Sequence, residues 1–156
     1  MFEHSEMDRV IARSESPEGL EQFAVNVASR SPKHALAARR RAVELRAATH
    51  WPETTVDREC LEAIYAYERA ESHLRGKKFH ASWPMIKRLG AVPAVETIVK
   101  RPAEMVGYRT LVELGLADKA FEAVVLRHEA LFSPDAVKTS RGRLRKWAVP
   151  AADSPA

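Results

Sequence analysis

Apolar residues recur three or four positions apart along most of this chain, which is the spacing that places them on one face of an α-helix. Two such stripes lie close together in the first third of the sequence, with Leu20, Phe23 and Val27 in the first and Ala35, Ala38, Ala42 and Leu45 in the second. Because only a few residues separate the two stripes, they predict an antiparallel helical hairpin.

Ser-Pro pairs mark the expected helix starts. Ser16-Pro17, Ser31-Pro32 and Ser133-Pro134 each precede a stretch with helical spacing. A serine hydroxyl at this position accepts an amide proton that the first helical turn leaves unpaired, and a proline after it has no amide proton to leave unpaired. The pairs therefore predict helices that begin near residues 17, 32 and 134. Ser82-Trp83-Pro84 is a looser form of the same signal.

The longest predicted helix covers about residues 55–75, opens at Thr54 or Thr55 and ends at Gly76. Beyond it, shorter apolar stripes predict five helices, around residues 83–89, 92–99, 108–112, 121–125 and 134–147. No alternation of period two persists for five residues, although β-branched residues leave a strand as an alternative at 92–99 and at 124–125. We expect these residues to be buried: Leu20, Phe23, Ile64, Tyr67, Ile86, Val95, Leu111, Phe121 and Val124.

These stripes predict an all-α fold with seven to eight helices in a single domain over residues 1–149. The hairpin is expected to pack beside the long helix, and the later helices to form a compact C-terminal cluster. Residues 150–156, which are Ala, Pro, Asp and Ser, are expected to be a disordered tail. At 156 residues, with 46% apolar and 29% charged residues, the composition is that of a globular chain.

The single cysteine, Cys60, excludes a disulfide within one chain and a zinc site made of several cysteines. Apolar runs are too short for a membrane span, and the acidic N-terminus lacks the apolar core of a secretory signal. A reducing, cytoplasmic environment is therefore expected, and Met7 is a candidate alternative start.

Charge is distributed unevenly between the two parts of the chain. Residues 1–76 hold 11 Lys and Arg against 13 Asp and Glu, a net charge of −2, whereas residues 77–156 hold 14 against 8, a net charge of +6. A one-sided positive surface attracts polyanions, chiefly nucleic acid, through phosphate contacts and counterion release.

The basic residues of the second part fall into three groups. The members are Lys77, Lys78 and His80 in the first, Lys87, Arg88, Lys100 and Arg101 in the second, and Lys138, Arg141, Arg143, Arg145 and Lys146 in the third. Helical spacing places Lys138, Arg141 and Arg145 on one side of the last helix, where they are candidates for phosphate contact. The alternatives are a solvated terminal helix for the third group and complementation of helix dipoles for the second.

The second group also brackets Gly90 in the manner of a helix-turn-helix, with residues 92–101 as the reading helix. Ile86 occupies a position where small residues usually allow close approach, and Pro93 lies at the start of the reading helix. Two short helices packed as ordinary elements of a bundle are therefore the favoured interpretation.

No catalytic motif is present in the sequence. It contains no glycine-rich phosphate loop, no nucleophile elbow and no zinc-protease motif, and its six histidines are scattered. We expect no catalytic residue, no metal and no cofactor. Cys60 lies among apolar positions and is expected to be a buried, unreactive thiol.

A block of the chain resembles a family of uncharacterised bacterial all-helical proteins. The segments that carry the resemblance are Met85–Gly90, Val95-Glu96, Arg101-Pro102, Gly107-Tyr108, Leu111–Leu116 and Ala120–His128. The resemblance covers about residues 60–145. It implies an all-helical bacterial protein linked to DNA biology, and it assigns no functional residue.

We therefore expect a non-enzymatic protein that binds nucleic acid mainly through backbone phosphates, without sequence specificity. The alternative is a helical protein–protein adaptor or self-associating module, in which the acidic part meets the basic part of a partner or of a second copy. Steep salt dependence of binding to arbitrary duplex DNA separates the two expectations.

Overall fold

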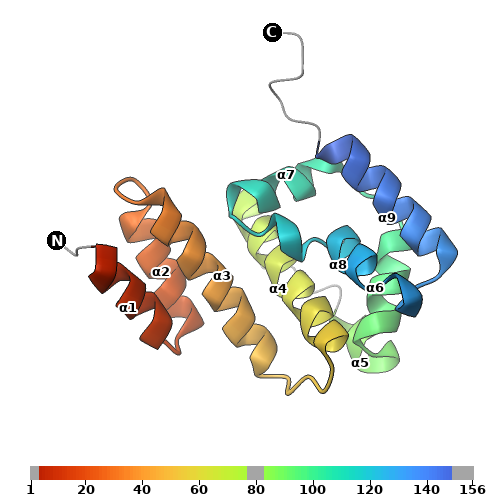
Figure 1. The fold of residues 1–156 in the computed structure, drawn as a ribbon, viewed down its shortest axis with the longest axis horizontal. Helices are drawn as coiled ribbons and strands as arrows, with labels where there is room; N and C mark the ends of the chain where they lie inside the picture. Colours follow the sequence, from red (N-terminus) through yellow and green to blue (C-terminus); the bar gives the residue numbers. More distant parts are fainter. Residues whose placement is uncertain (1–3, 77–82, 149–156) are drawn as a thin grey trace, which may run out of the picture.

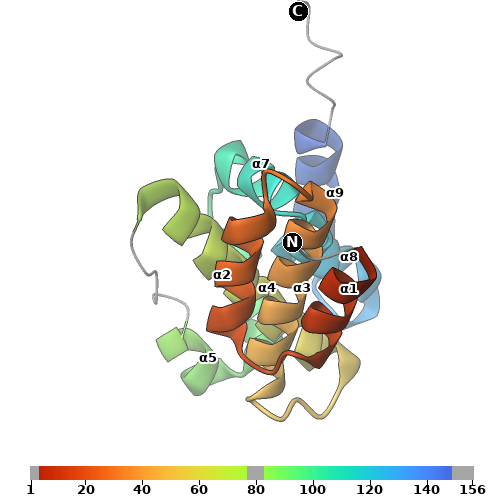
Figure 2. The ribbon, with the colours of Figure 1, turned by 90° about the vertical axis from the view of Figure 1, so that its left-hand side faces the viewer.

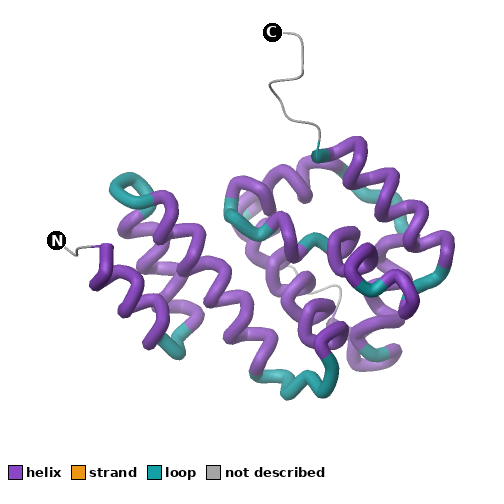
Figure 3. Tube along the Cα trace, in the orientation of Figure 1, coloured by secondary structure: helices purple, strands orange, loops and turns teal. Residues whose placement is uncertain are grey.

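The computed structural model describes residues 4–76 and 83–148, and within these ranges it consists of helices joined by loops and turns (Figures 1 and 3). Nine α-helices and two short 3-10 turns lie within them: α1 (His4–Arg13), α2 (Pro17–Val27), α3 (Pro32–Ala48), α4 (Thr55–Arg75), α5 (Trp83–Leu89), α6 (Ala91–Lys100), α7 (Met105–Glu113), η1 (Ala117–Lys119), α8 (Phe121–Arg127), η2 (Glu129–Leu131) and α9 (Pro134–Trp147). The all-α fold class is confirmed for the described residues. The strand alternatives at 92–99 and 124–125 are wrong, because these segments form α6 and α8.

The predicted helix starts agree with the structure. The hydroxyls of Ser16 and Ser133 accept the amide protons of Gly19 and Ala136, at 3.0 and 3.1 Å. Ser31 also precedes its helix, but its hydroxyl contacts the Nδ1 atom of His34 at 2.5 Å and caps no backbone amide. A local side-chain contact has replaced the expected cap at this one position.

The first three helices form a unit with a core of its own. Figure 2 shows α1, α2 and α3 side by side in front of the rest of the chain. Their shared core is made by these buried side chains: Met7, Ile11, Leu20, Ala24, Val27, Ala35, Ala38 and Ala42. The antiparallel α2–α3 hairpin is as predicted, whereas α1 is an additional helix that the sequence pattern did not reveal. Its contribution to this core is small, because it buries Met7 and Ile11.

Helix α4 runs along the junction between this unit and the C-terminal helices (Figure 1). It begins after Thr54, whose hydroxyl accepts the amide proton of Asp57, and it ends at Gly76, which adopts a left-handed conformation with φ of 67°. Among the helices that follow, α8 contacts α4, α6 and α9. Phe121 at the start of α8 stacks on Tyr67 of α4, with ring centroids 4.5 Å apart.

Most of the predicted core residues are buried. Six of the nine lie in the interior: Leu20, Ile64, Val95, Leu111, Phe121 and Val124. The other three, Phe23, Tyr67 and Ile86, are partly exposed and pack against the edges of the core clusters. Large side chains on an apolar stripe commonly reach the surface with some of their atoms.

Polar contacts join α3 to the C-terminal helices. Arg40 donates two hydrogen bonds to the Asp118 carboxylate, at 2.5 and 3.0 Å, and one to the carbonyl oxygen of Gly115. Gly115 has a φ of 74°, and a Cβ atom placed on it would lie 2.9 Å from Leu36. The chain therefore passes close against α3 at a position that only glycine fits without strain.

Residues 1–3, 77–82 and 149–156 lie outside the described residues, and so does the expected tail at 150–156. Within the described ranges, none of the helices combines the length and apolar character that crossing a bilayer requires.

Candidate functional site

Helix α9 presents most of its basic residues to solvent. Its inward face is formed by Ala136, Ser140 and Trp147, which are buried. The outward face carries four exposed cations, namely Lys138, Arg141, Arg145 and Lys146. We call these four residues the α9 basic face. Lys138, Arg141 and Arg145 lie on one side of the helix, as their spacing predicts.

Two of the cations predicted to contact phosphate, Arg141 and Arg143, are paired with other groups of the protein. The Arg141 guanidinium pairs with the carboxylate of Glu129 in η2. Arg143 is largely turned inward: it lies 3.1 Å from the buried Glu122, donates to the carbonyl oxygen of Arg101 at 2.5 Å and stands 5.7 Å from the centre of the Trp147 ring. These contacts hold α9 against α6 and α8.

Lys138, Arg145 and Lys146 have no carboxylate partner among the described residues. Their charges therefore face solvent without an internal counter-ion. The exposed Arg101 follows the end of α6, next to Arg143. Among the described residues that follow α4, α9 therefore carries three exposed cations without a carboxylate partner, and the other such cations are Lys87, Arg88, Arg101 and Arg109.

The second predicted group is divided by the fold. Lys100 pairs with Glu96 on its own helix, at 2.8 Å. Lys87 and Arg88 are exposed on α5. Figures 1 and 2 place α5 at the opposite end of the C-terminal cluster from the last turn of α9. Lys87 and Arg88 therefore do not form one surface with Arg145 and Lys146, whereas Arg101 lies next to Arg143 of α9. The first group, Lys77, Lys78 and His80, lies outside the described residues.

Helix α6 does not have the exposure of a DNA-reading helix. It contacts α4, α5, α8 and α9, and its residues Ala94, Val95 and Val99 are completely buried. A reading helix inserts one face into the major groove and must leave that face free. The arrangement around Gly90 is that of two short helices packed into a bundle.

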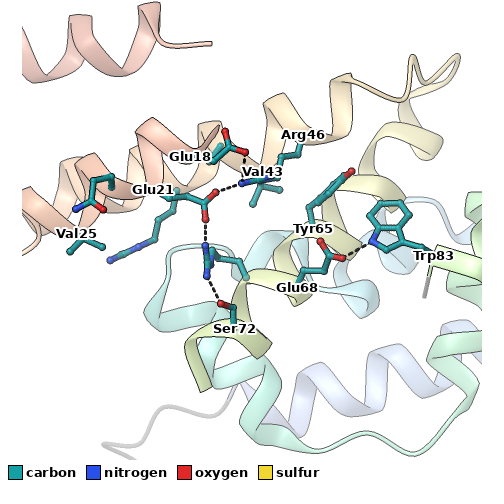
Figure 4. A pocket seen from close by; sticks show the side chains of 13 residues that line it. Glu18, Glu21, Val25, Val43, Arg46, Tyr65, Glu68, Ser72 and Trp83 are labelled. Carbon is teal, nitrogen blue, oxygen red and sulfur yellow. Dashed lines mark hydrogen bonds and ion pairs between the residues drawn. The ribbon is translucent and has the colours of Figure 1, made fainter. Parts of the chain in front are cut away.

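A cleft lies between α2, α3 and α4 and has a volume of about 600 Å³ (Figure 4). Side chains from all three helices line it, and Trp83 of α5 closes one end. The lining residues are Glu18, Glu21, Gln22, Val25, Arg39, Ala42, Val43, Arg46, Tyr65, Glu68, Arg69, Ser72 and Trp83. No sequence pattern signals this site, because its members come from helices that meet only in the folded chain.

Glu21 of α2 links the three helices that form the cleft. Figure 4 shows its carboxylate between α3 and α4. One oxygen accepts a hydrogen bond from Arg46 at 2.5 Å, and the other pairs with Arg69, whose guanidinium also donates to the hydroxyl of Ser72. At the far end, the Trp83 indole donates to the Glu68 carboxylate at 2.5 Å. The His50 ring stacks on Trp83 with ring centroids 5.1 Å apart.

A serine, a histidine and an aspartate are aligned where α1 meets α3. The Nδ1 atom of His34 lies 2.5 Å from the Ser31 hydroxyl, and its Nε2 atom lies 2.9 Å from Asp8. Hydrolytic serines must be open to substrate, whereas Ser31 and His34 are only 5% and 2% exposed. This alignment fastens α1 to α3 and does not form a hydrolytic site.

Other chemically reactive groups are also enclosed. Cys60 is completely buried, and burial, with the nearby charges of Asp57 and Glu59, raises the pKa of its thiol to about 12. Across the described ranges, no three side chains of His, Cys, Asp and Glu gather closely enough to hold a metal ion.

Comparison with known protein families, with characterised proteins and with solved structures gives no significant match in any of the three. These comparisons do not bear on the resemblance over residues 60–145.

Proposed function

We propose that this protein binds nucleic acid without catalysing a reaction on it, and that the α9 basic face contacts the phosphate backbone. The observation that supports this proposal is the set of three exposed cations, Lys138, Arg145 and Lys146, that have no carboxylate partner among the described residues. Uncompensated cations on one helix face attract a polyanion and release its counterions on binding.

The spacing of these cations suits a phosphate backbone. Lys138 and Arg145 are seven residues apart on α9, which corresponds to about two helical turns and about 10 Å along the helix axis. One DNA strand advances about 3.4 Å per phosphate along the duplex axis. Lys138 and Arg145 are therefore far enough apart to contact separate phosphates, and such contacts position a protein without reading sequence.

In this proposal Arg143 and Lys100 do not contact phosphate directly. Each pairs with a carboxylate of the protein, Arg143 with Glu122 and Lys100 with Glu96. Arg141 shares its charge with Glu129 and makes the weaker contribution among the exposed cations of the face.

The test is a salt titration of binding to a labelled duplex of arbitrary sequence, followed by fluorescence anisotropy. The variant Lys138→Gln/Arg145→Gln removes two charges and no internal ion pair. We expect it to weaken binding at least tenfold at low salt and to lower the slope of log K against log salt by about 1.8, since each phosphate contact contributes about 0.9.

A matched control is available at the other end of the molecule. Arg30 and Lys33 are exposed near the turn between α2 and α3, and neither has an ion-pair partner among the described residues. The variant Arg30→Gln/Lys33→Gln changes the net charge by the same amount and should bind within about twofold of the original protein. Equal losses in both variants, or no binding by the original protein at low salt, would refute the proposal.

A helical protein–protein interaction module is the second candidate. The observation that favours it is Trp51, which is 86% exposed in the connection between α3 and α4 and adopts a φ of 51°. Exposed tryptophans are frequent anchors of protein interfaces. Sedimentation of the protein and of Trp51→Ser tests self-association: a dimer that the substitution dissociates would favour this candidate.

A further inference from the structure

Three carboxylates and three guanidinium groups line the α2–α3–α4 cleft, and two of the guanidinium groups are paired with carboxylates of the lining. Glu21 pairs with both Arg46 and Arg69, and Glu18 lies 3.6 Å from Arg46. Arg39 lines the same cleft and has no hydrogen-bond or ion-pair partner among the described residues. One guanidinium in the cleft is therefore left without an internal counter-ion.

The antiparallel hairpin determines where Arg39 lies. Arg46, near the end of α3, contacts the first half of α2 at Glu18 and Glu21. Arg39 comes seven residues earlier, about two helical turns or 10 Å away. It therefore lies beside the second half of α2, where Gln22 and Val25 line the cleft.

Partial burial makes this unpaired charge costly. Arg39 is only partly exposed, and removal from water lowers the pKa of its guanidinium. A desolvated cation gains more from an anionic partner than a fully hydrated one, particularly through charge-assisted hydrogen bonds in which guanidinium donates to a carboxylate.

Apolar groups lie next to Arg39. Val25 is 68% exposed although it lines the cleft, and Ala42 and Val43 of α3 also belong to the lining. Tyr65 and Trp83 line the opposite end, next to Glu68. The volume of about 600 Å³ lies within the range of small-molecule sites.

We propose that the cleft binds a small organic monoanion. Its charged group pairs with Arg39, and its apolar body lies against Val25, because Ala42 and Val43 are only 2% and 3% exposed. Three carboxylates and three guanidinium groups line this cleft, so the lining has no net positive charge that would attract a polyanion such as nucleic acid. This site is therefore separate from the α9 basic face, and the two proposals can fail independently.

The test uses naphthalene-2-carboxylate as the probe and isothermal titration calorimetry on the full chain. We expect binding in the micromolar to millimolar range and at least tenfold weaker binding of 2-naphthamide, which has the same ring system without the charge. Arg39→Gln should weaken carboxylate binding at least tenfold, whereas Arg39→Lys, which keeps the charge, should recover part of it.

Two further variants locate the bound probe. Val25→Asp places a negative charge at an exposed position of the lining and should weaken carboxylate binding at least tenfold while the helical circular dichroism is unchanged. Arg30→Gln removes an exposed cation outside the lining and should bind within twofold of the original protein. Absence of carboxylate binding at millimolar probe, equal binding of the amide, or unchanged affinity in Arg39→Gln would each overturn the proposal.

Discussion

The ammonium of Lys119 lies 3.0 Å from a carboxylate oxygen of Glu62, and each of the two side chains is only 5% exposed. Lys119 ends the η1 turn and Glu62 lies in the middle of α4. A second carboxylate, that of Glu44 on α3, is 3.3 Å from the same ammonium. One buried cation thus joins the α1–α3 unit, the long helix and the C-terminal cluster.

Lys119→Met is expected to destabilise the protein by about 3–5 kcal/mol, because it leaves the buried Glu62 carboxylate without its main counter-charge. The free energy of unfolding, measured with urea, checks this value. The double variant Lys119→Met/Glu62→Leu should recover most of the loss, since a buried ion pair is often replaced by apolar groups at little cost.

The control for this prediction is Lys100→Met, which removes an ion pair with Glu96 in which the lysine is about half exposed. Exposed pairs contribute little to stability, so this variant should be nearly as stable as the original protein. Equal effects of Lys119→Met and Lys100→Met would contradict the structural role assigned to Lys119.

Gly115 and Gly76 provide a second comparison, because both have positive φ, of 74° and 67°. Alanine at either position must adopt a left-handed conformation, at a cost of about 1–2 kcal/mol. A Cβ atom at Gly76 meets no atom within 4 Å, whereas one at Gly115 lies 2.9 Å from two atoms of Leu36. Gly115→Ala should therefore cost about 2–5 kcal/mol, and thermal unfolding of both variants measures the difference.

Local patterns were sufficient to predict the larger part of the fold. The starts of α2, α3 and α9 and both ends of α4 follow from caps and prolines, which act within a single helical turn. Helix α1 was missed because it buries few side chains and has no comparable start signal. The prediction that the Ser31 hydroxyl caps its helix was wrong, because this hydroxyl contacts His34 instead. That contact depends on the packing of α1 against α3, where His34 also contacts Asp8.

The candidate sites were less predictable because they depend on contacts between distant segments. The outward face of α9 followed from helical spacing. That Arg143 turns inward did not, since its partner Glu122 lies on another helix and becomes buried only in the folded chain. The cleft likewise combines residues of α2, α3 and α4. Each of these three helices contributes four of the lining residues.

Cys60 is expected to be unreactive in the folded protein. It is completely buried, and its raised pKa of about 12 leaves almost no thiolate at pH 8. A disulfide reagent such as dithiobis(nitrobenzoate) should modify it at least a hundredfold more slowly in the native protein than in urea. Rapid modification without denaturant would show that α4 is accessible at this position.

Glu59 is expected to make the stability sensitive to acid. Burial alone would raise the pKa of its carboxyl group, but hydrogen bonds from His128 and Arg127, at 2.6 and 2.5 Å, outweigh burial and hold the pKa below its usual range. A carboxyl whose pKa is lower in the folded state stabilises that state above the unfolded pKa of about 4.3, and the stabilisation is lost as the pH falls through the folded pKa.

The variant Glu59→Gln should therefore be less stable than the original protein at pH 6, and the difference should shrink as the pH is lowered from 5 to 3, as measured by urea unfolding at each pH. Glu53→Gln is the matched control, because Glu53 is exposed and has no ion-pair partner among the described residues. Its difference from the original protein should stay small throughout. A difference for Glu59→Gln that is constant from pH 6 to pH 3 would show that the carboxylate has the same pKa in the folded and unfolded states.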